Sequence, residues 1–193
     1  MIQLYLASKS PRRKELLAQL GVTFDCIEGC VDESTLSNEA PQNYVLRLAI
    51  AKAAAGRKNI QAGFSHIPVL GSDTSVVISN EILGKPRDKQ EAIAMLSRLS
   101  GNSHIVYTAV AVNHNGTIRT VCCVTKVFFA AMTLSQINNY VATGEPMDKA
   151  GAYGIQGLGG RYIQKIDGSY TSVVGLPLYE TGMLLTECGV LSY

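Results

Sequence analysis

The chain has 193 residues, of which 47% are hydrophobic and 17% are charged, a composition that allows a packed core and excludes a disordered chain. Its net charge of +2 is too small to indicate a nucleic-acid-binding surface. No stretch approaches the roughly 20 apolar residues of a membrane-spanning helix, and no basic segment precedes an apolar run at the start, so we expect neither a membrane segment nor a signal peptide. The sequence predicts a cytoplasmic protein with one domain over residues 1–193.

The first predicted elements are a short strand over residues 4–7 and a helix that Pro11 opens. Ser10 suits the N-cap of this helix, and proline suits its first position. Arg12 and Arg13 follow in the first turn, where the helix dipole disfavours cations. Two guanidinium groups beside serine hydroxyls and unpaired helix N–H groups suit a phosphate or triphosphate. An ordinary capped helix with solvated arginines is the alternative interpretation.

Helical and extended patterns alternate through the rest of the chain, which predicts a mixed α/β fold. Apolar spacing, prolines and capping residues predict the helices, and apolar runs bounded by turn residues predict the strands. The expected helices cover residues 11–20, 41–57, 89–99 and 135–142 and a segment after Pro177. The expected strands cover 22–27, two short segments within 67–79 around Ser72–Asp73, a hairpin of 104–112 and 117–129, and 162–166.

Lys52 lies on the apolar face of the helix predicted over 41–57. It continues the stripe of Val45, Leu48 and Ala49, because residues at i, i+3, i+4 and i+7 share one side of a helix. A lysine on a buried face is uncommon unless its ammonium group is paired. Two interpretations stay open: the ammonium pairs with an acid or a phosphate, or the stem covers the core while the head reaches water.

Three carboxylates are candidates for catalysis or metal binding. Asp73 follows the apolar residues 67–70 and is expected at a strand-to-loop junction, where polar residues of α/β proteins often line a ligand crevice; an Asx-turn is the alternative. Asp32 and Glu33 lie in the polar segment 28–40 and offer the oxygen ligands that hard divalent cations prefer. Most acidic loops are simply solvated, so this pair is weak evidence by itself.

A glycine-rich segment and a turn lysine complete the candidate residues. Five of the ten residues in 151–160 are glycine, which permits the backbone to approach a flat ligand closely; a glycine-rich bend is the alternative. Gln156 within the segment offers a donor and an acceptor that suit a base edge, and a simple turn role is the alternative. Lys85 lies in a turn before Pro86 and by itself indicates only a solvated side chain.

The five cysteines and three histidines lack the spacing of a metal site. Cys122 and Cys123 are adjacent, and neighbouring residues of a strand point to opposite faces. We therefore expect reduced, mostly packed thiols, with neither a zinc site nor a Cys–His nucleophile.

These motifs together resemble the Maf family of nucleoside triphosphate pyrophosphatases over essentially the whole chain. The matching segments, in order, are LASKSPRRKELL, VDES, RLAIAKA, GSDTSVV, GKPRD, YTAV, DKAGAYGIQG and GSYTSVVGLP. The resemblance implies an α/β fold like that of inosine triphosphate pyrophosphatases, with a mixed sheet, flanking helices and two lobes around a cleft, and it implies a homodimer. It also implies a divalent cation, Mg²⁺ or Mn²⁺, and a nucleoside triphosphate substrate that is cleaved between its α- and β-phosphates into monophosphate and pyrophosphate.

The resemblance also implies roles for individual residues. These are catalytic roles for Asp73, Lys52 and Lys85, substrate-binding roles for Ser8, Arg12, Arg13, Thr74 and Gln156, and metal-binding roles for Glu33 and Asp73. Asp73 would be the general base that takes a proton from the attacking water. Arg12, Thr74 and Gln156 resemble the branch that acts on dTTP and UTP rather than the branch that acts on 7-methyl-GTP.

One small departure and two alternatives remain beside this interpretation. Ile50–Ala51 stand where the family commonly has a polar or charged residue before the lysine, although Lys52 itself is intact. A non-catalytic nucleotide-binding regulator of cell division would keep the arginine grip but would not need Asp73. A nucleotidyltransferase would share the triphosphate grip and the metal but would use a nucleophile other than water.

Overall fold

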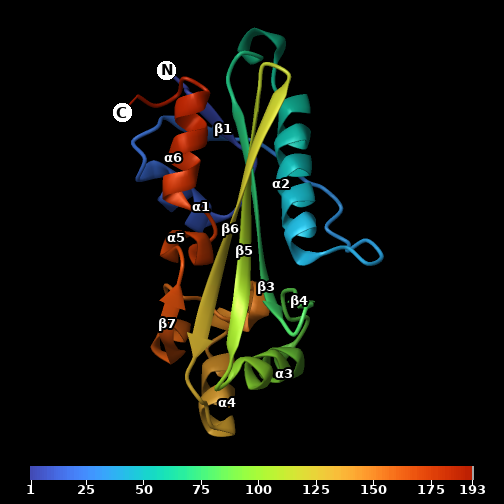
Figure 1. Ribbon diagram of the computed structural model, residues 1–193, viewed down its shortest axis with the longest axis vertical. Coiled ribbons are helices and arrows are strands. Elements are labelled where there is room, and N and C mark those ends of the chain that lie inside the picture. The colour runs from blue at the N-terminus through green and yellow to red at the C-terminus, as the bar shows by residue number, and fades with distance from the viewer. Residues whose placement is uncertain (193) are drawn as a thin grey trace. The chain divides into compact units, whose positions relative to one another are not determined.

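The computed structural model describes residues 1–192 (Figure 1). These residues form a seven-stranded mixed sheet with the strand order β2-β1-β3-β5-β6-β7, and β4 pairs with β3. The strands are β1 (Leu4–Leu6), β2 (Phe24–Cys26), β3 (Val69–Ile78), β4 (Glu81–Leu83), β5 (Ser103–His114), β6 (Thr117–Phe129) and β7 (Ile163–Asp167). β1 pairs in parallel with β2 and β3, whereas the β3–β4 and β6–β7 pairs are antiparallel. The predicted mixed α/β fold is confirmed.

The structure contains a helix near each of the five predicted positions and one further short helix, α5. They are α1 (Pro11–Ala18), α2 (Pro41–Lys58), α3 (Lys89–Leu99), α4 (Leu134–Ala142), α5 (Tyr170–Val174) and α6 (Leu178–Glu187), with short 3₁₀ turns at Ala62–Phe64, Glu145–Asp148, Ala150–Ala152 and Leu158–Tyr162. The Ser10 side chain accepts a hydrogen bond from the backbone of Arg13 at the start of α1, and Asp88 caps α3 through Glu91. No helix in residues 1–192 is long and apolar enough to cross a membrane.

The chain divides into two compact units. The first contains residues 1–73, 108–123 and the C-terminal segment from Gly175, and the second contains residues 74–107 and 124–174. Strands β3, β5 and β6 contribute residues to both units. The single domain over residues 1–193 and the cleft between two lobes stay predictions.

In the first unit, helix α2 packs closely on strand β3 at Gly71. A methyl group at Gly71 would clash with the Ala49 carbonyl oxygen and would lie 2.6 Å from the Ala53 nitrogen. Only glycine therefore allows the helix and the strand to approach this closely. The face of α2 that packs there is the predicted stripe, since Val45, Leu48 and Ala49 are at most 1% exposed. Figure 1 shows α2 on one side of the strands and α1 and α6 on the other.

The core of the second unit lies between its strands and helices α3 and α4. It contains Val76, Leu83, Ala92, Met95, Leu96, Leu99, Val106, Val127, Phe129, Met132, Ile137, Tyr140, Val141, Ala152, Tyr153 and Tyr162. His104 is buried against this cluster, with its ring centroid 5.8 Å from that of Phe129 and 5.4 Å from that of Tyr153. Its Nε2 atom hydrogen-bonds the Tyr153 hydroxyl at 2.8 Å, while its Nδ1 atom has no partner among residues 1–192.

The structure corrects two features of the predicted strands. Residues 67–79 were expected to form two short segments, but β3 is continuous over Val69–Ile78. Asp73 therefore lies inside a strand rather than at a strand-to-loop junction. The prediction of a strand-to-loop junction is wrong because the Lys52 ammonium group of α2 compensates the Asp73 carboxylate, so the strand continues through this position. The hairpin between β5 and β6 is confirmed, and its turn residues Asn115 and Gly116 have φ angles of +49° and +77°, which suit a two-residue turn.

Some elements and side chains lie outside what the patterns predicted. Strand β4 and helix α5 were not expected, because each is too short to show a periodic apolar pattern. The five cysteines are free thiols, as expected, but Cys26 and Cys30 are exposed rather than packed. Cys26 ends the edge strand β2, whose outer side has no neighbouring strand among residues 1–192, and Cys30 lies in the loop that follows it.

Burial makes the second unit sensitive to acid through one histidine. Burial lowers the pKa of His104 to about 4, so the folded protein keeps this ring neutral while the unfolded chain binds a proton below about pH 6.5. The unfolded state then holds more protons, so the unfolding free energy falls as the pH decreases from 6.5 toward 4. We expect His104 to account for a loss of about 2 kcal/mol between pH 7.5 and pH 5. Urea titrations of the wild type and of His104→Gln at both pH values measure it, and an equal pH dependence of the two proteins would contradict the assignment.

Candidate functional site

The start of helix α1 carries the predicted cluster of arginines and serines. The Arg13 Nη1 group donates to the Ser8 hydroxyl at 3.5 Å, and the Ser10 N–H donates to the same hydroxyl at 3.2 Å. The Arg13 Nε group donates to the Gly175 carbonyl at 2.9 Å, which fixes the direction of the guanidinium plane. Arg12 precedes it in the same turn and is partly buried. The helix start therefore presents basic side chains and backbone N–H groups together.

Lys52 joins the two predicted metal-binding carboxylates. Its Nζ atom lies 2.6 Å from Glu33 Oε1 and 2.7 Å from Asp73 Oδ1. The Lys52 and Asp73 side chains are only 12% and 9% exposed, whereas Glu33 is 56% exposed. Of the two interpretations of Lys52, the structure supports pairing with an acid. The pair forms because Asp73 and Gly71 share one face of β3, and α2 approaches that face.

The acidic segment that carries Glu33 is tied to helix α2. The Tyr44 hydroxyl donates to the Glu33 carbonyl at 2.8 Å, and Arg47 Nη2 donates to the Ser34 carbonyl at 3.0 Å. Arg47 also contacts both carboxylate oxygens of Glu39, at 2.6 and 2.7 Å, in the paired geometry that guanidinium and carboxylate groups favour. One helix thus positions both Lys52 and the segment that carries its exposed partner.

The charges in this unit shift one another's protonation. Burial raises the pKa of Asp73, and the positive charges of Lys52 and Arg13 oppose that rise. Burial lowers the pKa of Arg13, and the charge of Asp73 opposes that change. A carboxylate whose pKa is raised is a stronger base, and one that stays close to two cations is available in its ionised form.

The opposite face of β3 carries a contact that sequence reasoning missed. The Ser72 hydroxyl donates to the Gly175 carbonyl at 3.1 Å, so Ser72 and Arg13 share one acceptor. Gly175 has a φ angle of +129°, which residues with a side chain rarely adopt. The segment GSYTSVVGLP matches a motif of the family, but a motif match does not show which backbone groups make contacts. A glycine before a proline-containing turn was the available signal, but it does not identify the partner of the carbonyl.

The remaining predicted residues belong to the second unit. Lys85 is exposed in the turn after β4, where it lines an open cavity of about 320 Å³ together with Arg87 and Arg98. Gln156 is exposed in the glycine-rich segment. Thr74 follows Asp73 in β3, so its side chain leaves the strand on the opposite face. The structure therefore gathers Ser8, Arg12, Arg13, Glu33, Lys52 and Asp73 in the first unit, and the assigned roles of all nine residues stay predictions.

The residues present fit a divalent cation that arrives with a phosphorylated substrate. Residues 1–192 contain no cluster of three or more acidic, histidine or cysteine side chains that holds a metal by itself. Glu33 and Asp73 nevertheless converge on one cation, the Lys52 ammonium group. Mg²⁺ typically takes one or two protein carboxylates and completes its shell with substrate phosphates and waters. Two carboxylates beside a basic helix start meet that requirement.

The basic start of α1 and the Lys52 ammonium group between Glu33 and Asp73 both lie in the first unit of a mixed α/β fold. The family model described as Maf-like protein matches residues 3–188, and the chain belongs to this family. The predicted family resemblance is confirmed.

Relatives of this chain cover nearly its whole length. A dTTP/UTP pyrophosphatase from Shigella dysenteriae serotype 1 (strain Sd197) is 52% identical over 191 residues, which make up 99% of this chain and 95% of the relative. A dTTP/UTP pyrophosphatase from Escherichia coli O157:H7 shows the same identity and coverage. So does a nucleoside triphosphate pyrophosphatase from Shigella flexneri.

The coupling between Lys52 and Asp73 is measurable as stability. Lys52→Met leaves the Asp73 carboxylate buried beside too little positive charge, and we expect it to lower the unfolding free energy by about 3 kcal/mol, the scale for breaking a buried ion pair. The double variant Lys52→Met/Asp73→Asn removes both charges and should recover most of that loss. Urea titrations of the two single variants and the double variant give the interaction energy. A loss in the double variant equal to the sum of the two single losses would show that the two groups are not coupled.

Proposed function

We propose that this protein hydrolyses dTTP and UTP to the nucleoside monophosphate and pyrophosphate. The observation that carries the proposal is the Lys52 ammonium group bound between Glu33 and Asp73, in the unit that also presents Arg13 at a helix start. These residues supply positive charge for binding phosphate and two carboxylates for binding a cation. They also supply a base, Asp73, whose pKa is raised by burial. The names of relatives that are 52% identical over nearly the whole chain support the substrates.

The arrangement suggests how binding and chemistry are linked. Arg12, Arg13 and Ser8 bind the triphosphate through charge-assisted hydrogen bonds. A phosphate oxygen that binds the Lys52 ammonium group competes with Asp73 for its positive charge. The charge of Lys52 then lowers the pKa of Asp73 less than before. Asp73 then accepts a proton from a water molecule more readily. That water attacks the α-phosphorus, the bond from this phosphorus to the bridging oxygen breaks, and pyrophosphate leaves.

A divalent cation, Mg²⁺ or Mn²⁺, would be held by Glu33 and Asp73 together with triphosphate oxygens. When bound, it supplies positive charge that stabilises the phosphate oxygens as negative charge develops. Lys85 and Lys52 add further positive charge for the triphosphate. We also propose from the family resemblance that the protein is a cytoplasmic homodimer, and that neither nucleic acid nor a membrane takes part in the reaction.

Asp73→Asn tests the general-base role. Asparagine keeps the size of the side chain and a hydrogen-bond acceptor for Lys52, but it cannot take a proton from water. We expect kcat to fall by about 100-fold or more, the scale for removing a general base, while nucleotide binding persists. Pyrophosphate release with Mg²⁺ measures turnover, and calorimetric titration measures binding. Asp25→Asn, at an exposed position of β2 in the same unit, is the matched control and should keep wild-type kcat. Near-normal turnover of Asp73→Asn would refute the role.

The substrate proposal predicts a defined order of nucleotides. Thymine and uracil present the same acceptor–donor–acceptor edge, which the Gln156 amide and nearby backbone groups can complement. Cytosine reverses two of these positions, so we expect kcat/KM for CTP to lie about 10- to 100-fold below that for UTP. UTP and dTTP should lie within about tenfold of each other, because one methyl group contributes little. Pyrophosphate assays over UTP, dTTP, CTP and purine triphosphates decide it.

Binding without pyrophosphate release would instead favour a non-catalytic regulator, and transfer to a second nucleophile would favour a nucleotidyltransferase.

A further inference from the structure

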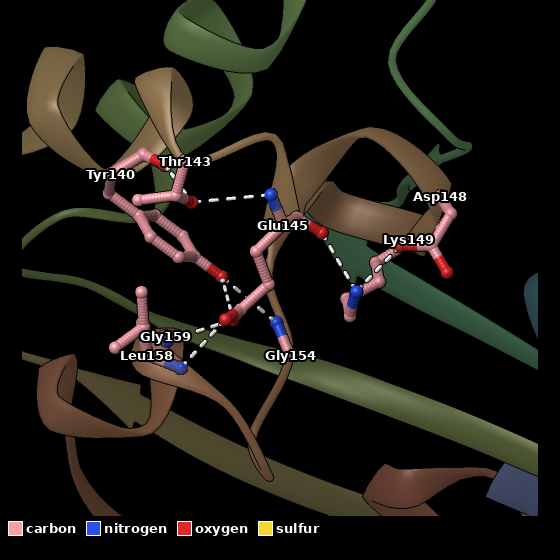
Figure 2. Close-up of polar contacts among 8 residues, drawn as sticks. All are labelled: Tyr140, Thr143, Glu145, Asp148, Lys149, Gly154, Leu158 and Gly159. Atoms are coloured by element: carbon pink, nitrogen blue, oxygen red, sulfur yellow. Dashed lines mark hydrogen bonds and ion pairs between the residues drawn. The ribbon is translucent and has the colours of Figure 1, made fainter.

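One carboxylate in the second unit holds both ends of the glycine-rich turn that carries Gln156. Glu145 Oε2 accepts the backbone N–H of Leu158 at 2.8 Å, and Oε1 accepts the N–H of Gly159 at 3.1 Å (Figure 2). Oε1 also accepts the Tyr140 hydroxyl proton at 2.8 Å, and the same hydroxyl accepts the Gly154 N–H at 3.2 Å. The turn over residues 154–159 is therefore anchored at its start through Tyr140 and at its end directly.

The backbone of the turn lies directly against these two side chains. A methyl group at Gly157 would lie 2.5 Å from both carboxylate oxygens of Glu145. A methyl group at Gly159 would lie 2.5 Å from the Tyr140 hydroxyl oxygen. The glycines at these two positions thus permit the close approach of the turn to the Glu145 carboxylate and the Tyr140 hydroxyl.

Glu145 is itself fixed in place. Its N–H donates to the Thr143 hydroxyl at 3.2 Å, and its carbonyl accepts from Lys149 Nζ at 2.8 Å. Burial acts to raise the pKa of Glu145, but hydrogen bonds from Leu158, Tyr140 and Gly159 together hold that pKa below its ordinary value. The group is therefore ionised at neutral pH and accepts all three hydrogen bonds.

Besides Glu145 and Tyr140, the turn is ordered by two backbone hydrogen bonds, from the Gly157 N–H to the Gly154 carbonyl at 3.3 Å and from the Gly160 N–H to the Gly157 carbonyl at 3.1 Å. Gln156, Gly157 and Leu158 are exposed, so no buried side chain anchors this part of the chain. A glycine-rich segment loses a large conformational entropy when it adopts one structure. The hydrogen bonds to Glu145 offset that loss in the turn that carries Gln156, whose side chain must point in a defined direction.

We propose that Glu145 is a positioning residue for base selection, and that its carboxylate holds the 154–159 turn so that the Gln156 amide meets the uracil or thymine edge. The inference rests on the proposed function, because it takes Gln156 as the residue that contacts the base. Glu145 does not touch the substrate in this account and acts only through the turn.

Glu145→Gln tests the inference with a side chain of the same shape. Its amide NH₂ cannot accept a backbone N–H, so one anchor of the turn becomes unfavourable. We expect KM for UTP to rise about tenfold with kcat changed less, and the ratio of kcat/KM for UTP to that for CTP to fall by a similar factor. Tyr140→Phe removes the Gly154 anchor and the hydrogen bond from the hydroxyl to Glu145 Oε1. It leaves the Leu158 and Gly159 anchors in place, so it should give a smaller fall in the same ratio. Glu81→Gln is the control, because Glu81 lies in the same unit and makes a surface ion pair with Arg98; it should leave the ratio unchanged.

Amide hydrogen exchange gives a readout that does not depend on activity. Glu145→Gln should increase exchange at Leu158 and Gly159 while the core strands keep their protection. An equal loss of kcat/KM for UTP and CTP, or faster exchange with an unchanged ratio, would overturn the inference while the proposed function stands. A wild-type enzyme that does not prefer UTP to CTP would overturn the proposed substrate and the inference with it. If Glu145→Gln fails to fold, the Tyr140→Phe result decides in the same way.

Discussion

The contact between helix α2 and strand β3 is the constraint on which the rest of the first unit depends. Gly71 removes the side chain that would keep the helix away, and Asp73, two residues further on the same strand face, meets Lys52 at 2.7 Å. A buried carboxylate inside a strand is costly unless a cation compensates it. The fold therefore needs the same close approach that produces the candidate site, so stability and chemistry share one pair of charges.

The sequence predicted most elements because their signals are local. Ser10, Pro11 and Asp88 act within a few residues of the helix starts that they cap, and the Asn115–Gly116 turn determines its hairpin from two residues. Asp73 shows where such reasoning ends. A carboxylate after an apolar run indicates the end of a strand when only its neighbours are considered, but its partner lies on another element, 21 residues away in the chain.

The sequence indicated the charged residues of the candidate site, but it did not indicate the groups that orient them. The residues that bear charge, such as Arg13 and Lys52, stood out because their positions disagree with the helix dipole or with the apolar stripe. The groups that orient them did not stand out. The Gly175 carbonyl and the Glu145 carboxylate act through contacts between segments distant in the chain, or through backbone N–H groups, which no side-chain pattern records.

The division of the chain between its units has a consequence for synthesis on the ribosome. The chain passes from one unit to the other at residues 73–74, 107–108, 123–124 and 174–175. During synthesis, N-terminal domains generally fold before later ones. The first unit here, however, is incomplete until the segment from Gly175 has been made. The Arg13 guanidinium group therefore lacks its carbonyl acceptor until the segment from Gly175, 162 residues later, has been made. During that interval the Arg13 Nε group and the Ser72 hydroxyl lack the acceptor that they share in the folded protein.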